Sequence, residues 1–244
     1  MAKTAMTFNS KAMVFGSSSK WIAVASEDTA VIGGKKYRTV TLADGNVWMA
    51  ENLDLVFDGL TVNTSGSPGG YGNFAAYYDF DEATYGWSGT KYGLYYNGIA
   101  AQYIDSNRAT ICPGWHVPSL SEIIALGSAL GGTWDEYQSQ CAGVGIAMRS
   151  TQEWLYSSGS NSSGFNARPV GSYHSTSPAG WKWFGSYAGF YTSTKVQGSS
   201  LYQYLFTLST SDYPSYLYKN DRMIIAQGDS WYSVGNIRLV KDKE

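Results

Sequence analysis

The stretch ICPGWHVPSLSE, residues 111–122, contains the clearest helix start in the chain. Ser119 and Glu122 form the S-x-x-E pattern of a capping box, in which each side chain pairs with the other residue's backbone N–H. The apolar residues that follow recur at i, i+3 and i+7 and share one helical face: Ile123, Leu126 and Leu130. This pattern predicts a helix that begins at Ser119 and ends at the glycine pair 131–132.

A second helix is expected directly after the glycine pair. The stretch TWDE, residues 133–136, repeats the capping pattern with threonine in place of serine. Three residues from this point on would share one face of the helix: Tyr137, Cys141 and Val144. Cys141 is therefore expected to be a small core residue rather than a reactive thiol.

Strand patterns lie on both sides of these helices. Before them, residues 37–42 and 47–49 are strand candidates, and Asp44-Gly45 between them predicts a type I′ hairpin turn. From about residue 147 onward, strand-type runs return: WKWFGSYAGFYTSTK, LYQYLFTLST, SYLYK, RMIIAQ and NIRLVKD. Helices in the middle and strands at both ends predict an α+β fold, in which the two ends of the chain can pair in one sheet.

The chain is expected to divide into a short leader and one larger domain. Residues 1–35 contain two brief apolar runs, AMVFG and KWIAVAS, with GSSS between them, and are expected to form an attachment segment. Residues 36–244 are expected to form the domain, with a long functional loop from about 56 to 93. The start lacks the apolar run of a signal peptide, and no stretch reaches the roughly 18–20 apolar residues of a membrane span.

Composition excludes some classes of function. A net charge of −2 and the absence of a basic run argue against a general nucleic-acid binder. Two cysteines, Cys112 and Cys141, are too few for a disulfide scaffold, and their spacing does not suggest zinc; a single bridge between them stays open.

The residues that carry catalysis or bind metals elsewhere form no known motif here. His116 is expected to hold its loop by a ring hydrogen bond, and His174 is expected in a loop. No H-E-x-x-H, phosphate-binding loop or Ser/His/Asp order is present. The DFDE stretch, residues 79–82, offers oxygens to a hard cation, but a solvated turn is the favoured interpretation. No enzyme activity, cofactor or metal is therefore expected.

Aromatic residues make up 16 % of the chain, and many lie late in it, where they predict a binding surface. Tyrosine and tryptophan supply rigid contact area with polar tips, and serine and asparagine supply adaptable hydrogen bonds. The expected ligand-binding residues, here called the late contact set, are Trp181, Trp183, Tyr202, Tyr204, Ser211, Asp212, Tyr213, Tyr216, Tyr218, Asn220, Asp229, Ser230, Trp231 and Tyr232. Alternate strand residues must instead face the core: Leu201, Leu205 or Phe206, Leu217, Ile224 and Ile237.

Six motifs in a fixed order carry a resemblance to a known family. They are DGNVWMAENL (44–53), KYGLYYNGIAA (91–101), ICPGWHVPSLSE (111–122), GFNARPVG (164–171), FYTST (190–194) and IRLVKD (237–242). Together they resemble the Fibrobacter succinogenes major paralogous domain family over about residues 37–242. That family is similar to the C-type-lectin-like fold of formylglycine-generating enzymes and of variable proteins diversified by retroelements. The resemblance implies small twisted antiparallel sheets, two helices, long loops and a binding face built from the late loops and strands.

The chain departs from the family pattern at its cysteines. In the family, the cysteine of the C-P-x-G-W-H-V-P-S motif usually has a partner in the last strand. Leu239 stands at that place here, so Cys112 lacks the partner that the resemblance implies. The formylglycine-generating relatives work through two late cysteines, and none follows Cys141, so that chemistry is not carried over.

The resemblance leads to one functional hypothesis and two alternatives. We expect a non-enzymatic receptor-binding protein of a phage tail, diversified by a retroelement and located on the virion or outside the cell. Its partner would be a cell-surface protein or glycan, not nucleic acid or the membrane interior, and it would form a homo-oligomer, a trimer, through the N-terminal segment. The alternatives are an adhesion protein of the cell surface or envelope of Bacteroidetes-like bacteria, and an enzyme resembling the formylglycine generators.

Overall fold

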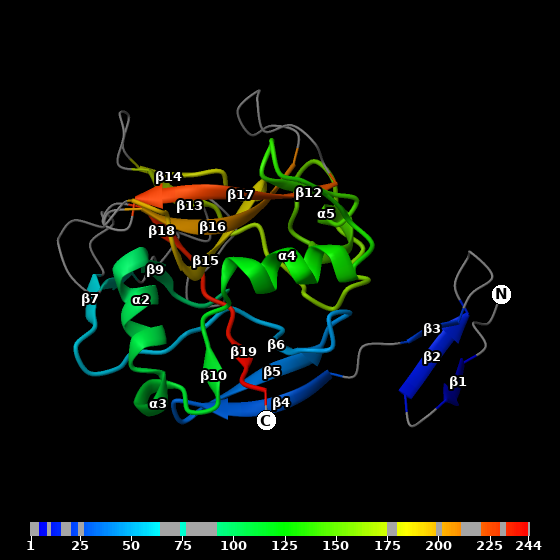
Figure 1. Cartoon of the computed structure of the whole chain (residues 1–244), viewed down its shortest axis with the longest axis horizontal. Coiled ribbons are helices and arrows are strands. Elements are labelled where there is room, and N and C mark those ends of the chain that lie inside the picture. The colour runs from blue at the N-terminus through cyan, green and yellow to red at the C-terminus, as the bar shows by residue number, and fades with distance from the viewer. Residues whose placement is uncertain are drawn as a thin grey trace.

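The fold is α+β, as the sequence predicts: the helices of the described residues lie between residues 98 and 148, most strands lie before or after them, and the strand pairs are antiparallel except for one parallel pair, residues 61–63 with 74–76 (Figure 1). The computed structural model describes residues 5–8, 11–15, 21–23, 27–63, 74–76, 92–174, 180–198, 202–210, 221–229 and 233–243. Within these ranges the strands form five sheets.

The first sheet is built from the N-terminal strands alone. Its antiparallel order is β1-β2-β3, with β1 at Ala5–Phe8, β2 at Lys11–Phe15 and β3 at Trp21–Ala23. The next strand, β4 (Glu27–Ile32), pairs with β5 (Lys35–Thr41) in a different sheet. The division into a leader and a domain at residue 35 stays a prediction.

A second sheet, the framework sheet, joins the two ends of the domain. Its order is β10-β19-β6-β5-β4, with β6 at Val47–Met49, β10 at Trp115–His116 and β19 at Val240–Lys241. Val240 of β19 lies opposite Trp48 of β6, which confirms that the early and late strands pair. Figure 1 shows the blue early strands beside the red end of the chain.

The hairpin between β5 and β6 is confirmed, but the expected type I′ turn is wrong. Type I′ needs positive φ at two residues, and only Gly45 has it, at +80°. The Gly45 amide donates to the Leu42 carbonyl over 3.0 Å, the pattern of a type I turn followed by a left-handed glycine. Asp44 instead uses its carboxylate, which accepts from the Asn46 amide at 3.1 Å and from Trp48 Nε1 at 3.0 Å.

A third sheet, the late sheet, contains the longest strands. Its order is β11-β12-β17-β16-β15, with β11 at Thr133–Asp135, β12 at Gln140–Ala142, β15 at Tyr187–Lys195, β16 at Tyr202–Ser209 and β17 at Arg222–Asp229. Leu205 and Phe206 are both buried, although they point to opposite faces, because each face has its own apolar cluster. Ile224 and Ile237 are buried as expected.

The remaining strands make two small sheets. One pairs β13 (Ser172–His174) with β14 (Gly180–Lys182), so His174 ends a strand rather than lying in a loop. The other has the order β18-β9-β8-β7, with β7 at Thr61–Asn63, β8 at Phe74–Ala76, β9 at Tyr95–Asn97 and β18 at Val234–Gly235. The stretch expected as one long loop from 56 to 93 therefore includes two short strands.

The helix expected at Ser119 is confirmed as α4 (Leu120–Ala129). The Ser119 side chain accepts from the Glu122 amide, and the Glu122 carboxylate accepts from the Ser119 amide at 2.8 Å, which completes the capping box. Three further helices were not predicted: α2 (Gly98–Ser106), α3 (Arg108–Ile111) and α5 (Gly145–Met148). Residues 149–171, where the sequence predicts a return to strands and turns, contain one isolated bridge, between Arg149 and Ala167.

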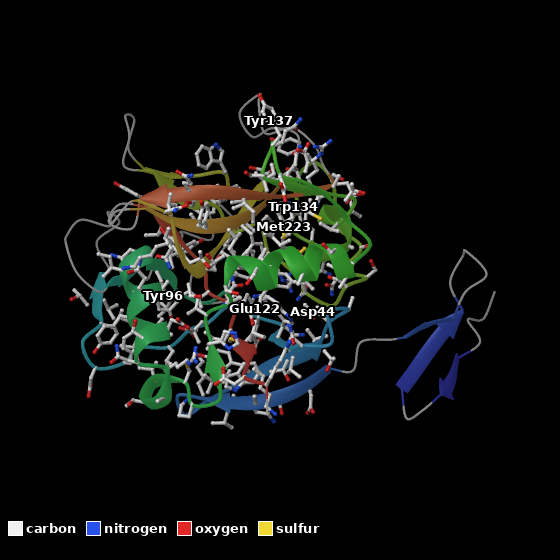
Figure 2. All side chains as sticks on the ribbon, in the orientation of Figure 1. Asp44, Tyr96, Glu122, Trp134, Tyr137 and Met223 are labelled. Atoms are coloured by element: carbon white, nitrogen blue, oxygen red, sulfur yellow. The ribbon has the colours of Figure 1, made fainter. Side chains whose placement is uncertain are left out.

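The helix expected after the glycine pair is wrong, since this stretch forms the β11–β12 hairpin. The Asp135 carboxylate accepts from the Gln138 amide at 3.0 Å, and Ser139 has a φ of +49°, so the chain turns back instead of continuing as a helix. Trp134 lies opposite Cys141 and packs on the cluster that contains Met223 (Figure 2). Cys141 is nevertheless buried, as predicted, but Tyr137 is 97 % exposed at the hairpin turn.

Candidate functional site

Most of the late contact set lies outside the described residues. This holds for Ser211, Asp212, Tyr213, Tyr216, Tyr218, Asn220, Ser230, Trp231 and Tyr232. The DFDE stretch, residues 79–82, and the expected core residues Leu201 and Leu217 lie outside them as well. For Trp181, Tyr202 and Asp229 the structure describes the backbone, which places them on β14, β16 and β17.

The β16–β17 pair of the late sheet has two ends, which differ in the members of the late contact set nearest to them in the sequence. Tyr202 lies opposite Asp229 at one end of the β16–β17 pair. At the other end, here called the stem end, β16 finishes at Ser209 and β17 begins at Arg222, so residues 211–220 connect these strands there. At about 3.3 Å per residue, the two ends are roughly 23 Å apart.

Backbone contacts fix both strands at the stem end. The Asp221 carbonyl accepts from the Gly143 amide at 2.7 Å, and its carboxylate accepts from the Ile146 amide at 2.8 Å. On the other strand, the Thr210 amide donates to the Ser186 carbonyl at 3.0 Å. The chain therefore enters and leaves the segment 211–220 from fixed positions.

Exposed apolar side chains lie at the stem end and in the loop that contacts it. Ile146 is 37 % exposed beside Asp221, and Leu155 and Tyr156 are 66 % and 54 % exposed. The Leu155 amide donates to the Gly185 carbonyl at 2.8 Å, one residue before the Ser186 that holds Thr210. Sequence reasoning missed these residues because no local pattern marks a short exposed stretch in a loop.

Two aromatic members of the late contact set have described side chains. Trp183 is partly buried, its ring centroid lies 5.9 Å from that of Tyr187, and its φ is +64°. A bulky residue in the left-handed region is strained, and such strain often marks functional segments. Tyr204 is also partly buried, and it packs against the core cluster of the late sheet, so part of its ring serves packing.

A separate cleft of about 340 Å³ lies beside the framework sheet and was not predicted from the sequence. It is lined by Lys35, Lys36, Tyr37, Arg38, Ala50, Glu51, Asn52, Asp54, Tyr92, Gly93, Asn166, Arg168 and Arg238. The fold brings these residues together from five separate segments of the chain, so no local motif could reveal them.

Arg238 is the buried anchor of this cleft. It is 1 % exposed, and its Nε donates to the Asn52 side-chain oxygen at 2.8 Å. Its terminal nitrogens donate to the carbonyls of Met49, Phe165 and Asn166. Burial lowers the pKa of Arg238 to about 9; Glu51 opposes this shift, whereas Arg38 and Arg168 add to it. The Arg238 guanidinium therefore connects three of the six family motifs: its own and the two that supply its hydrogen-bond acceptors.

Gly93, from a fourth motif, allows the chain to approach this anchor closely. Its φ is +86°, and a Cβ there would lie 2.8 Å from the Leu53 carbonyl oxygen and from Asn52 Cβ. No other residue type fits that space without a shift of the backbone.

His116 ties the start of α4 to the last strand, as the predicted structural role requires. One ring nitrogen lies 2.9 Å from Glu122 Oε1, and the other lies 2.7 Å from Asp242 Oδ1. Figure 2 shows Glu122 at the start of α4, between this helix and the framework sheet. The hydrogen bond to Glu122 raises the pKa of His116, burial opposes the rise, and Asp242 adds to it. The two carboxylates thus hold the imidazole in place from both ring nitrogens.

The two cysteines are buried as free thiols in different clusters. Cys112 shares its cluster with Leu239, the residue at the place where the family pattern has a cysteine. Burial, followed by Asp105 and Asp242, raises the pKa of the Cys112 thiol to about 12. Neither thiol is therefore suited to nucleophilic chemistry at neutral pH.

Among the described residues, no group of three or more His, Cys, Asp or Glu side chains is placed to hold a metal ion. None of the described helices is long and apolar enough to cross a membrane.

Comparison with known proteins gives one match. The family model of the Fibrobacter succinogenes major domain matches residues 43–241, which include both the framework sheet motifs and the late sheet. No curated protein and no solved structure matches the chain.

Proposed function

The chain belongs to the Fibrobacter succinogenes major domain family, and on that premise we propose that it is a non-enzymatic protein that binds a ligand at the stem end of the late sheet. We further propose that its fold is C-type-lectin-like, since short antiparallel sheets, paired chain ends and a long late hairpin are the features that this fold implies. The ligand is a protein or glycan on a cell surface. The protein acts as a receptor-binding component of a phage tail, on the virion.

One observation carries this proposal: exposed apolar side chains lie near the two fixed strand ends between which residues 211–220 run. Ile146, Leu155 and Tyr156 lie beside the strands that lead into and out of residues 211–220. That segment contains Tyr213, Tyr216 and Tyr218. Fixed ends reduce the conformational entropy that binding must remove, and exposed apolar groups rimmed by polar ones are typical of interaction sites.

The affinity would come from a few aromatic contacts. Such contacts contribute about 1–2 kcal/mol each, while their neighbours mainly exclude water. Trimers formed through the N-terminal segment would present three such surfaces, and simultaneous binding would strengthen the attachment. The alternative of an adhesion protein of the bacterial surface uses the same surface and differs in where the protein is located.

Binding to intact cells tests the proposal. Labelled protein is titrated onto a panel of Bacteroidetes strains, and the strain that binds is used to compare two variants. The double variant Leu155→Ala/Tyr156→Ala should bind about tenfold more weakly. The matched variant Tyr137→Ala removes an exposed ring from the β11–β12 hairpin and should bind like the parent. Equal loss in both variants would contradict binding at the stem end.

The retroelement hypothesis has its own test, which is the sequence of this locus in sibling isolates. Substitutions concentrated within residues 181–233 would support it. Substitutions scattered evenly along the chain would contradict it.

A further inference from the structure

The cleft beside the framework sheet concentrates positive charge in a chain whose net charge is −2. Five basic side chains line it: Lys35, Lys36, Arg38, Arg168 and Arg238. Two acidic side chains, Glu51 and Asp54, line it as well. A concave surface with an excess of one charge attracts ligands of the opposite charge.

Ion pairs within and around the cleft neutralise only part of this charge. Lys35 pairs with Asp54, Arg38 Nε lies 3.5 Å from Glu51, and Arg168 lies 2.6 Å from Glu153. Among the described residues, no carboxylate pairs with Lys36, which is exposed, or with Arg238, which is buried.

Arg238 retains a donor that the protein does not use. A guanidinium has five N–H groups, and four hydrogen bonds account for four of them, all to neutral oxygens: Asn52 Oδ1 and the carbonyls of Met49, Phe165 and Asn166. The fifth N–H, on Nη2, has no acceptor among the described residues. Because Arg238 lines the cleft, an oxyanion there would supply both the missing acceptor and the missing counter-charge.

The rest of the lining indicates what carries the oxyanion. Glu51 and Asp54 would repel a multiply charged ligand, but their carboxylates accept hydrogen bonds from hydroxyl groups. The partly buried Tyr92 gives the wall an aromatic surface, and the Arg168 guanidinium lies 5.9 Å from the centre of its ring. A ligand with one negative charge and several hydroxyls matches this set of donors and acceptors better than phosphate does.

We propose that the cleft binds an acidic monosaccharide unit, a uronic acid, with its carboxylate at Arg238 and Lys36 and its hydroxyls at Glu51 and Asp54. The cleft shares no residue with the late contact set, so this site is independent of the stem end and does not rest on the proposed function. A volume of about 340 Å³ lies within the range of small-molecule sites and suits one sugar ring rather than an oligosaccharide.

Titration of the whole chain with D-glucuronate tests the site, with D-glucose and inorganic sulfate as comparison ligands. Binding is followed at low salt by calorimetry and by the NMR signal of the Arg238 side-chain N–H. Glucuronate should give a saturable shift of that signal. Glucose and sulfate should bind at least about tenfold more weakly, because glucose lacks the negative charge and sulfate lacks the sugar hydroxyl groups. Sulfate that binds as tightly as glucuronate would overturn the assignment to a sugar, and the absence of a saturable shift would overturn the site.

A charge variant separates the cleft from the general surface. Lys36→Gln removes an exposed, unpaired charge, so it should fold normally and bind glucuronate about three- to fivefold more weakly. Lys195→Gln removes an exposed lysine on β15 and should leave binding unchanged. Equal affinities in the two variants would show that Lys36 does not contact the ligand and would overturn this placement of the carboxylate.

Discussion

The framework sheet and the late sheet are stabilised in different ways. Three strands of the framework sheet are short, with two residues in β10 and β19 and three in β6, and buried side-chain hydrogen bonds from Arg238 join this sheet to distant segments. Three strands of the late sheet, β15, β16 and β17, have eight or nine residues, and their side chains pack into apolar clusters on both faces. A buried polar network therefore adds to the apolar packing of the framework sheet, whereas the late sheet depends mainly on burial of apolar area.

This difference predicts where sequence change is tolerated. A buried hydrogen-bond network loses much of its stability when one member is removed, because the others are left without partners. A packed sheet tolerates change at its ends, since only the covered middle carries the apolar contacts. Three of the family motifs accordingly meet at Arg238, while most of the late contact set precedes or follows β17 in the sequence.

The largest effect is expected when the framework loses its buried anchor. Arg238→Met fills much of the same space but leaves Asn52 Oδ1 and the carbonyls of Met49, Phe165 and Asn166 without their donor. We expect the free energy of unfolding to fall by about 3 kcal/mol or more, measured by urea denaturation. The relief of a desolvated charge reduces the loss but does not cancel it.

Arg108→Met is the matched control, because Arg108 is exposed and its nearest carboxylate, Asp105, is 3.7 Å away. It should change the free energy of unfolding by less than about 0.5 kcal/mol. Equal effects of the two substitutions would contradict the contrast between the two sheets, since the buried network would then contribute no more to the free energy of unfolding than an exposed arginine does.

A smaller, pH-dependent effect is expected at His116, which joins α4 to the framework sheet. His116→Gln should lower the free energy of unfolding by about 1–2 kcal/mol near pH 5.5, because two charge-assisted hydrogen bonds are lost at a partly exposed site. Lys243→Gln, which removes an exposed charge next to Asp242, is the control and should show no such loss.

The pH profile of this loss follows from two shifts of opposite sign. The pKa of His116 is raised in the folded chain, so its contribution is complete below its ordinary value of 6.5 and disappears as the pH rises through the raised value. Burial would raise the pKa of Glu122, but hydrogen bonds from His116 and Ser119 outweigh it and lower that pKa to about 2, so its contribution disappears as the pH falls from 4.5 toward 2. The difference between parent and variant should therefore be largest between these limits, and a flat difference from pH 4 to pH 9 would contradict the pairing.

Features with a complete local signal could be predicted from the sequence. The capping box at Ser119 and the apolar stripe behind it suffice for α4, and strand propensity with Asp44-Gly45 suffices for the β5–β6 hairpin. The same kind of local pattern gives a wrong prediction at residues 133–136, because T-x-x-E occurs there in a strand and its turn instead of at a helix start. There the pairing of β12 with β17, which involves residues 80 positions away, selected the strand.

The candidate sites were less accessible to sequence reasoning. No local pattern in the sequence distinguishes Arg238 from the other arginines, and only the fold brings Asn52 and Phe165 to it. Exposure of Leu155 and Tyr156 depends on how the loop after α5 returns to Gly185, which no periodicity encodes. The late contact set is predicted from amino-acid composition, and composition does not tell which end of a strand a residue occupies.

The smallest effect is expected at the stem end, where Asp221 holds the start of β17. Asp221→Ala removes the carboxylate that accepts from the Ile146 amide in the first turn of α5, so it should lower the free energy of unfolding by only about 1 kcal/mol. Glu136→Ala, at an exposed position of the β11–β12 hairpin, is the control and should be neutral. The local consequence should be larger than the global one: amide hydrogen exchange at Ile146 and Gly143 should accelerate while Phe206 and Met223 stay protected. If Asp221→Ala instead destabilised the whole chain as much as Arg238→Met, the stem end would be part of the folding core and not a fixed base for a binding surface.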